Sequence, residues 1–335
     1  MIRTSPAETK VVICVWHLFS EWRPKPLMAD SLRRRWPDMN VVHLPDYDRL
    51  PQELSDTNIF VGYSLRASQL NQARRLQWIH STAAGVAQLN YPELRDSGIM
   101  VTNSRGVLSA TIAEHGLGLM IARARNFPDA MRFQDQRHWA QQELWDKPQH
   151  LRELAGQTLL IVGFGSIGQG LAKLARAFSM RILSVTRSGK SDPTLADGSF
   201  PVSRLEDALP QADYVVLAAP ETPETKSLIG AKQFARMKPT AVFINVARGS
   251  LLDEAALIAA LETGQIAGAA LDVAAQEPLP PESPLWTTKN LFITPHSSAV
   301  SEALWPRQTA MFMELLERWF AGNDLFNVVD FSRGY

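Results

Sequence analysis

Short apolar runs alternate with amphipathic runs along most of the chain, and this alternation constrains the fold more than any other feature. In the first hundred residues the apolar runs have the length and composition of buried strands, and the runs between them have helical spacing. We expect strands at Val11–Val15, Asn40–Leu44, Asn58–Gly62, Trp78–Ser81 and Met100–Thr102, and helices at Pro26–Trp36, Ala67–Arg75 and Tyr91–Ser97.

A second alternation begins at Gln157. Since strands that alternate with helices form a parallel sheet covered on both faces, the sequence predicts an α/β protein. We expect two Rossmann-like or flavodoxin-like domains, each a doubly wound parallel sheet, with a cleft between them. Residues 1–103 with 300–335 should form one domain, and residues 104–299 the other. The second alternation predicts strands at Thr158–Val162, Arg181–Val185, Tyr214–Ala218, Ala241–Val246, Gly268–Val273 and Leu291–Thr294, and helices at Ile167–Phe178, Glu254–Thr263 and Glu302–Phe320.

A long helix is predicted between the two alternations. Thr111 and Glu114 have the spacing of a capping box, so the helix should run from about Thr111 to Asn126, with Pro128 marking its end. It is apolar on several sides, which predicts burial between domains or subunits. The polar segment Asp129–Leu151 has little periodicity and is predicted to be a surface excursion, with a subunit contact as one role for it.

Composition excludes several classes of function. Lys plus Arg and Asp plus Glu number 34 each, so no net charge favours nucleic acid or an anionic membrane. The single cysteine, Cys14, excludes an internal disulfide and a cysteine metal cluster, and its apolar neighbours predict a buried, inert thiol. We expect no metal site. The N-terminus lacks the layout of a signal peptide and the apolar run after it is too short to span a bilayer, so we expect a cytoplasmic protein.

A glycine-rich turn, G-x-G-x-x-G, lies between a predicted strand and a predicted helix. The pattern alone is weak, but in this context it is typical of a turn that binds a dinucleotide pyrophosphate. Glycines permit a tight turn and close approach, and the helix N-terminus supplies N–H groups. The alternative is an ordinary strand–helix turn. The residues predicted to contact the cofactor here are Gly163, Gly165, Ser166, Ile167 and Gly168.

The next predicted strand should end at the adenosine ribose, where an NAD site commonly has an acid. This strand instead ends in Thr186, Arg187 and Ser188, with Lys190 close by. A guanidinium and hydroxyl groups suit a 2′-phosphate, so the pattern predicts NADP(H) in preference to NAD(H). The alternative is that Arg187 is a surface residue beside a tolerant NAD site.

Three charged residues, Arg248, Glu277 and His296, follow predicted strand ends, where ligands bind in an open α/β sheet. Together they suit the reduction of a 2-oxo acid. A histidine donates the proton that the carbonyl oxygen needs, a carboxylate beside it favours the imidazolium, and an arginine grips the substrate carboxylate. Taken singly, each residue has a structural alternative. Arg248 could be a turn residue, Glu277 could begin a loop, and His296 could be a hydrogen-bonded core histidine.

These motifs resemble those of D-2-hydroxyacid dehydrogenases, along nearly the whole chain. Asn245–Gly249 resembles the arginine motif of that family, and Thr294–His296 its histidine motif. Ala270–Val273, which leads to Glu277-Pro278, resembles its acid motif. The glycine turn and Ala113–His115 match as well.

The resemblance implies that His296 is the acid/base, Glu277 its partner and Arg248 the substrate anchor. It implies a substrate-binding first domain, a dinucleotide-binding second domain and a homodimer. Backbone N–H groups after Ala83 would hold the substrate carboxylate, and Asp272 would lie near the nicotinamide carboxamide. The alternative for the loop after Ala83 is an ordinary turn at the end of a strand, and the alternative for Asp272 is a cap of nearby backbone. The substrate residues so implied are Tyr63, Ala84, Gly85, Val86 and Arg248, with Leu65 close to the pocket; the further cofactor residues are Pro220, Thr225, Val246, Ala247 and Asp272.

One departure from the family pattern bears on the cofactor. Thr186 stands where an aspartate is common, so the similarity is nearest to NADPH-preferring glyoxylate and hydroxypyruvate reductases. We expect NADPH-dependent reduction of a small 2-oxo acid to the D-2-hydroxy acid. One alternative is a cofactor-sensing interaction protein of the corepressor type, with the same fold and dinucleotide site. Another is a methyltransferase, which the ordered Arg, Glu and His do not suggest.

Overall fold

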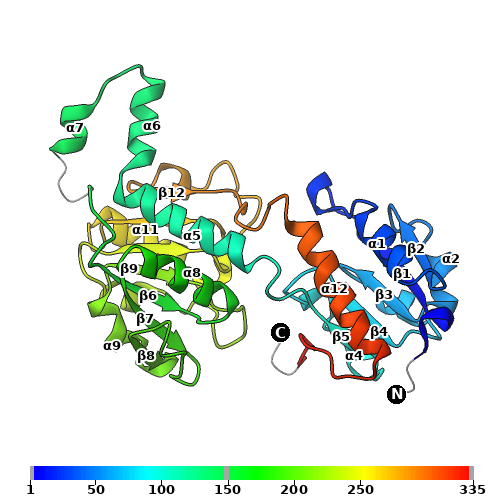
Figure 1. Cartoon of the computed structure of the whole chain (residues 1–335). Helices are drawn as coiled ribbons and strands as arrows, with labels where there is room; N and C mark the ends of the chain where they lie inside the picture. The colour runs from blue at the N-terminus through cyan, green and yellow to red at the C-terminus, as the bar shows by residue number, and fades with distance from the viewer. Residues whose placement is uncertain (1–3, 147–150, 332–335) are drawn as a thin grey trace. The chain divides into compact units, whose positions relative to one another are not determined.

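The computed structural model describes residues 4–146 and 151–331. The chain divides into two compact units (Figure 1): unit 1 comprises Met1–Leu108 and Val300–Tyr335, and unit 2 comprises Ser109–Ala299. Each unit contains one sheet in which all pairs of strands are parallel, with helices on both faces. The predicted α/β fold class is therefore confirmed.

Unit 1 has a five-stranded sheet in the order β2-β1-β3-β4-β5. Alternate residues of a strand face opposite sides, so this sheet forms two cores. Val11 and Ile13 pack with the helices α1 and α12, whereas Val12 and Cys14 pack with residues of α2, α3 and α4. The elements are β1 Lys10–Cys14, α1 Leu27–Arg35, β2 Asn40–Leu44, α2 Leu50–Glu53, β3 Ile59–Gly62, α3 Ala67–Leu70, β4 Trp78–Ser81, α4 Pro92–Arg95, β5 Met100–Thr102 and α12 Leu304–Phe320.

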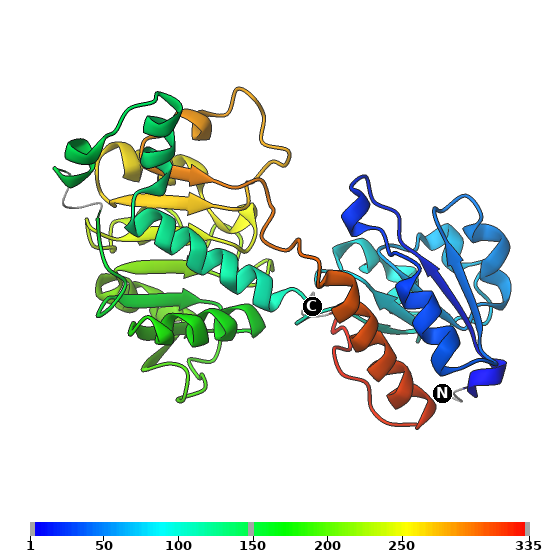
Figure 2. The same ribbon diagram turned by 45° about the horizontal axis from the view of Figure 1, so that its top comes forward.

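Unit 2 has a seven-stranded sheet in the order β12-β11-β10-β9-β6-β7-β8 (Figure 2). One face packs with α5 and α8, and the other packs with α9, α10 and α11. The elements are α5 Ser109–Ala124, α6 Phe127–Asp135, α7 Gln141–Trp145, β6 Thr158–Val162, α8 Ser166–Ala177, β7 Arg181–Thr186, β8 Gly198–Pro201, α9 Leu205–Ala208, β9 Tyr214–Leu217, α10 Ala231–Phe234, β10 Val242–Asn245, α11 Glu254–Glu262, β11 Gly268–Leu271 and β12 Leu291–Ile293.

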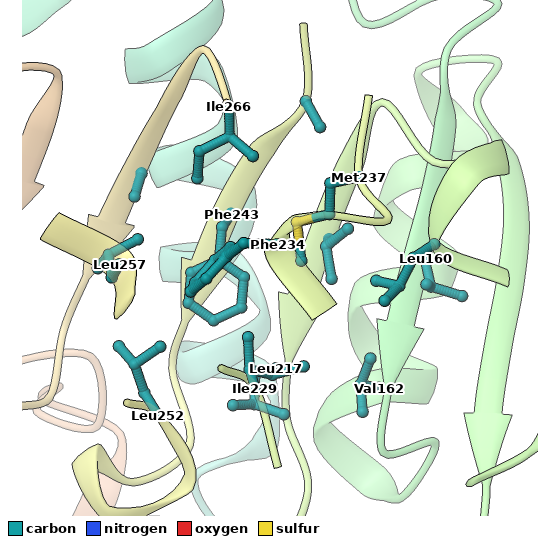
Figure 3. Packing of buried hydrophobic residues seen from close by; sticks show 14 of the residues in the cluster. Leu160, Val162, Leu217, Ile229, Phe234, Met237, Phe243, Leu252, Leu257 and Ile266 are labelled. Carbon is teal, nitrogen blue, oxygen red and sulfur yellow. The ribbon is translucent and has the colours of Figure 1, made fainter. Parts of the chain in front are cut away.

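The core beneath α10 and α11 shows how residues far apart in the sequence hold this sheet together (Figure 3). Phe234 from α10 meets Phe243 from β10 edge to face, with ring centroids 5.5 Å apart. Both rings are fully buried, as is Leu257 of α11. Burying a side chain of this size stabilises the fold by about 1.5–3 kcal/mol, so this face anchors the middle of the sheet.

The first helix of unit 2 differs from the prediction. Helix α5 begins at Ser109, so Thr111 lies inside it and the predicted capping box is wrong. Its burial arises within unit 2, where it packs against α8 and the sheet; Gly116 lies close to Leu171 and Val246. Within unit 2 this packing accounts for the buried residues of α5, and the predicted burial between domains or subunits stays a prediction.

Most of the predicted surface excursion is helical. Pro128 stands in the first turn of α6, a position that proline tolerates, and α7 follows. Residues 147–150 of the excursion lie outside the described residues. Two further predictions need correction: the helix predicted to Arg75 ends at Leu70, and β8 was not predicted because Gly198–Pro201 is a half-buried edge strand without a continuous apolar run.

Cys14 is fully buried, and burial raises the pKa of its thiol to about 12. The predicted burial of this thiol is therefore confirmed. Within residues 4–146 and 151–331, no helix has the length and apolar character that crossing a bilayer requires. The same part of the chain contains no cluster of three or more His, Cys, Asp or Glu side chains arranged to hold a metal ion.

The fully buried His80 predicts acid-sensitive stability. Desolvation lowers the pKa of His80 to about 3, whereas a histidine in an unfolded chain titrates near pH 6.5. Between these values the unfolded state binds the additional proton, so the stabilisation is complete above about pH 6.5 and falls as the pH falls towards about 3. We expect His80 to contribute a slope of up to about 1.4 kcal/mol per pH unit to the free energy of unfolding.

Urea unfolding between neutral pH and about pH 4 measures this slope. His80→Asn should flatten it, whereas His17→Asn, a change at a less buried histidine, should leave it as in the wild type. Equal slopes in the wild type and His80→Asn would contradict the assignment.

Candidate active site

The glycine turn after β6 is built for close approach of backbone. Gly163 has φ +97°, and a Cβ there would lie 2.5 Å from the backbone of Ala219. A Cβ at Gly168 would lie 2.3 Å from the carbonyl oxygen of Gly163. Neither position accepts a side chain without displacing backbone, so the strand–turn–helix geometry requires glycine at both.

Gly165 has a different environment. It is the N-cap residue of α8, and a Cβ there would meet no described atom within 4 Å. Ser166 and Ile167 follow in the first turn of this 12-residue helix, where N–H groups have no partner within the helix. Open space beside these donors fits the pyrophosphate of a dinucleotide, which Gly165 can approach because it lacks a side chain.

The loops next to the glycine turn carry the other residues predicted to bind the cofactor. Thr186 ends β7, and Arg187 and Ser188 after it are exposed. The Thr225 hydroxyl donates to the carbonyl of Pro220 at 2.8 Å, which closes the loop after β9. Val246 and Ala247 are buried directly after β10, and Asp272 is 1% exposed after β11.

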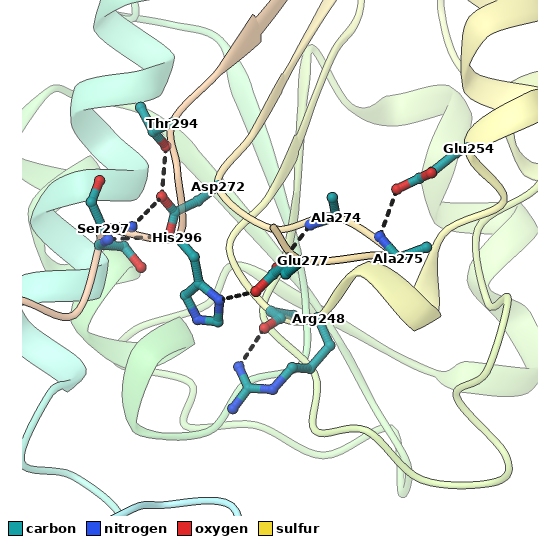
Figure 4. A network of polar contacts seen from close by, with 11 residues as sticks. Arg248, Glu254, Asp272, Ala274, Ala275, Glu277, Thr294, His296 and Ser297 are labelled. Carbon is teal, nitrogen blue, oxygen red and sulfur yellow. Dashed lines mark hydrogen bonds and ion pairs between the residues drawn. The ribbon is translucent and has the colours of Figure 1, made fainter. Parts of the chain in front are cut away.

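Arg248, Glu277 and His296 line one cavity of about 220 Å³ in unit 2. The Nδ1 atom of His296 lies 2.5 Å from Oε2 of Glu277, and the other oxygen of Glu277 accepts from the N–H of Ala274 at 2.9 Å (Figure 4). The Arg248 guanidinium donates to the carbonyl of Ala247 at 2.6 Å. Nε2 of His296 makes no hydrogen bond to residues 4–146 or 151–331.

Close packing beyond β10 places Arg248 beside the loop of Glu277. A Cβ at Gly249 would lie 1.9 Å from the carbonyl carbon of Ala274, so only glycine allows these two segments to meet. His296 itself has φ +51°, a left-handed conformation, and its N–H donates to the carbonyl of Asp272 at 2.7 Å. Neighbouring backbone therefore holds the histidine in an otherwise unfavourable conformation.

Asp272 caps the histidine turn, as the structural alternative in the sequence analysis proposed. Its Oδ1 accepts from the Thr294 hydroxyl at 2.6 Å and from the N–H of Ser297 at 3.0 Å, and its Oδ2 accepts from the N–H of Ser298 at 3.1 Å (Figure 4). His115 of α5 adds a contact of 3.0 Å from Nε2 to the Thr294 hydroxyl. The sequence analysis assigned no role to the hydroxyl of Thr294, although a polar side chain two residues before His296 could have indicated one.

The residues predicted to bind substrate other than Arg248 belong to unit 1. Tyr63 follows β3 and is 46% exposed, and Ala84 and Gly85 in the loop after β4 are exposed. Val86 is 1% exposed. Leu65 is fully buried in the core of unit 1, and its place close to the substrate pocket stays a prediction.

A second, larger cavity does not carry the predicted chemistry. It has a volume of about 750 Å³ and lies beside the amino ends of β3 and β4, where Asp56 and Arg75 line it. Ligands of open α/β sheets bind at the carboxyl ends of the strands. Position and chemistry therefore favour the smaller cavity around His296 as the active site.

Substitution of Gly165 should change cofactor binding, whereas substitution of Gly168 should change stability. Gly165→Ala should weaken NADPH binding about tenfold or more and leave the melting temperature unchanged, because the added methyl enters only the space proposed for phosphate. Gly168→Ala should lower the melting temperature, because its methyl meets backbone. Fluorescence titration and thermal unfolding measure the two effects. Unchanged NADPH affinity in Gly165→Ala would place the dinucleotide elsewhere.

Comparison with known proteins agrees with this geometry. The family model described as "D-isomer specific 2-hydroxyacid dehydrogenase, NAD binding domain" matches residues 117–298. A glyoxylate reductase of Pyrococcus furiosus is 36% identical over 292 residues, which cover 86% of this chain and 83% of that protein.

Two solved structures share the fold across both units. A D-isomer specific 2-hydroxyacid dehydrogenase family protein of Aeromonas salmonicida is 31% identical, with a TM-score of 0.83 over 97% of this chain and 99% of that one. A D-isomer specific 2-hydroxyacid dehydrogenase of Xanthobacter autotrophicus, solved with NADPH and MES, is 27% identical, with a TM-score of 0.80 over 98% of this chain and 100% of that one. The chain is thus an oxidoreductase with a nicotinamide-dinucleotide-binding domain, and it belongs to the D-isomer specific 2-hydroxyacid dehydrogenase family.

Proposed function

We propose that this protein is an NADPH-dependent reductase that converts a small 2-oxo acid, similar to glyoxylate or hydroxypyruvate, to the D-2-hydroxy acid. The observation that carries the proposal is the hydrogen-bonded pair of His296 and Glu277, which lines one cavity together with Arg248. The Pyrococcus relative named glyoxylate reductase supports the class of substrate. Unit 1 would bind the substrate and unit 2 the dinucleotide. A single buried cysteine suits a cytoplasmic location.

The residues of the cavity divide the chemistry among them. A bound nicotinamide supplies the hydride that adds to the carbonyl carbon of the substrate. His296 gives its Nε2 proton to the carbonyl oxygen as that oxygen gains electron density. Glu277 accepts from Nδ1 and so orients the imidazole and favours the protonated form that can donate. Arg248 binds the substrate carboxylate and polarises the carbonyl.

Other predicted residues take supporting roles in this proposal. The N–H groups of Ala84, Gly85 and Val86 would bind the substrate carboxylate, and Tyr63 would shape the pocket. Asp272, whose carboxylate caps the histidine turn, would position His296 in addition to its proposed place near the carboxamide.

The cofactor preference rests on the end of β7. Thr186 supplies no carboxylate to the ribose 2′-hydroxyl, and exposed Arg187 offers a guanidinium to a 2′-phosphate. The Xanthobacter structure, which holds NADPH, supports the same preference.

We expect the wild-type protein to oxidise NADPH with glyoxylate or hydroxypyruvate, at a higher kcat/KM than with NADH. Loss of the proton donor in His296→Ala should lower kcat/KM by about 10²-fold or more. His138→Ala is the matched control, because His138 is an exposed histidine that also pairs with a glutamate, Glu143, outside the cavity. Arg187→Ser should reduce the preference for NADPH about tenfold.

Initial rates with both nucleotides and a panel of 2-oxo acids decide among the outcomes. Turnover that survives in His296→Ala would remove this residue from the mechanism, and a preference for NADH would overturn the role of Arg187. NADPH binding with no turnover of any 2-oxo acid would favour the interaction-protein alternative.

We also propose a homodimer formed through α6 and α7. These helices and their connection expose large apolar side chains, namely Phe127 at 49%, Met131 at 62%, Trp139 at 88% and Trp145 at 63%. Apolar side chains gathered on one segment are typical of an interface. Light scattering should give twice the mass of the chain, and Met131→Glu combined with Trp139→Glu should give the monomer. A wild-type monomer at micromolar concentration would refute the proposal.

A further inference from the structure

The loop that follows β4 in unit 1 has occupied carbonyl groups and free N–H groups. Four consecutive carbonyl oxygens, those of residues 81 to 84, lie within hydrogen-bond distance of a donor. The N–H groups of Ala84, Gly85 and Val86 reach no acceptor among residues 4–146 and 151–331. An unpaired N–H is costly on a residue as buried as Val86, which is 1% exposed. The loop therefore has donors to offer to a ligand.

Three buried residues hold these carbonyls, and we call Asn103, Ser104 and Gln308 the carbonyl-holding network. The Asn103 side chain donates to the carbonyl of Ala84 at 2.8 Å. The backbone N–H of Ser104 donates to the carbonyl of Ala83 at 3.1 Å. Gln308, on α12, donates from Nε2 to the carbonyl of Thr82 at 2.6 Å. The Ser104 hydroxyl lies 2.8 Å from the carbonyl oxygen of Ser81 and 2.7 Å from Oε1 of Gln308.

A chain of buried donors and acceptors connects this network to Trp78, Thr102 and His80. The indole N–H of Trp78 can only donate, and it donates to the Thr102 hydroxyl at 2.9 Å. That hydroxyl also lies 2.9 Å from Nδ1 of His80, and Nε2 of the same ring lies 3.4 Å from the Ser104 hydroxyl. Because every member is at most 2% exposed, solvent does not compete for these bonds.

We propose that the carbonyl-holding network consists of positioning residues for carboxylate recognition. By turning the carbonyls of residues 81 to 84 towards buried donors, it leaves the N–H groups of Ala84, Gly85 and Val86 free to bind the carboxylate of a 2-oxo acid. Successive free N–H groups form a concave site for an anion. The inference rests on the proposed function, and it gives Gln308 of the C-terminal helix α12 a part in substrate binding.

Gln308→Met tests this inference, because methionine has a similar size and lacks both the amide donor and the amide acceptor. The probe is oxamate, titrated by calorimetry into protein that is saturated with NADPH. We expect its dissociation constant to rise about tenfold, the usual effect of losing one buried hydrogen bond. The dissociation constant of NADPH should stay unchanged. Where glyoxylate is turned over, KM should rise in parallel while kcat changes less than about twofold.

Thr309→Val is the matched control, because Thr309 is the next residue of α12, is buried to a similar degree and its hydroxyl makes no hydrogen bond to the loop in the described part of the chain. It should leave oxamate binding unchanged. Asn103→Ala removes the donor to the carbonyl of Ala84 and should weaken oxamate binding, as Gln308→Met does. It provides a second test if Gln308→Met does not fold.

The outcomes separate this inference from the proposed function. An unchanged oxamate dissociation constant in Gln308→Met or Asn103→Ala, an equal loss in Thr309→Val, or a wild-type protein that binds no oxamate would overturn the positioning role. A wild-type protein that binds oxamate but reduces no 2-oxo acid would refute the proposed reaction, and the comparison of variants would still decide the role of the network.

Discussion

Parallel strand pairing is the constraint on which the rest of this structure depends. It brings the carboxyl ends of the strands to one edge of each sheet, where the backbone loses its ladder partners. Buried side chains then supply the missing hydrogen bonds. In unit 2 the carboxylate of Asp272 does so for the turn that carries His296, and in unit 1 Asn103 and Gln308 do so for the loop after β4. Each sheet thus holds an exposed loop in place with buried polar groups.

Burial separates the residues that maintain the fold from those that are suited to chemistry. The side chains of His296 and Glu277 are 42% and 36% exposed, and an ion pair with this exposure contributes only about 0–1 kcal/mol to stability. Stability alone therefore gives little reason for their close contact, which fits the proton-donor role that we propose for His296. Asp272, which is 1% exposed and accepts three hydrogen bonds, lies at the other extreme. Removal of its carboxylate would leave buried donors unpaired.

Glycines set how closely these loops approach one another. Gly163 and Gly168 bring the end of β6 against the loop after β9 and against α8, and Gly249 brings the arginine loop against Ala274. At each of these positions a Cβ would overlap backbone, so packing alone requires glycine. At Gly165 no described atom opposes a Cβ, so a substitution there tests the proposed phosphate site without displacing backbone.

The sequence by itself determined the fold class and the order and type of most strands, because apolar runs report burial on both faces of a sheet. It also located Arg248, Glu277 and His296, since parallel topology brings residues after strand ends to one edge, and the structure places all three around one cavity. The edge strand β8 escaped prediction because only β7 pairs with it and its residues are half-buried.

Only the tertiary structure decided how the loops are held. Gln308 and Thr82 are 226 positions apart, and their hydrogen bond exists because α12 packs on the sheet of unit 1. Packing on α8 and its own sheet likewise accounts for the buried residues of α5, whose partners the sequence did not identify. Periodicity reports which side of an element is buried, but it carries no information on which distant residue covers that side.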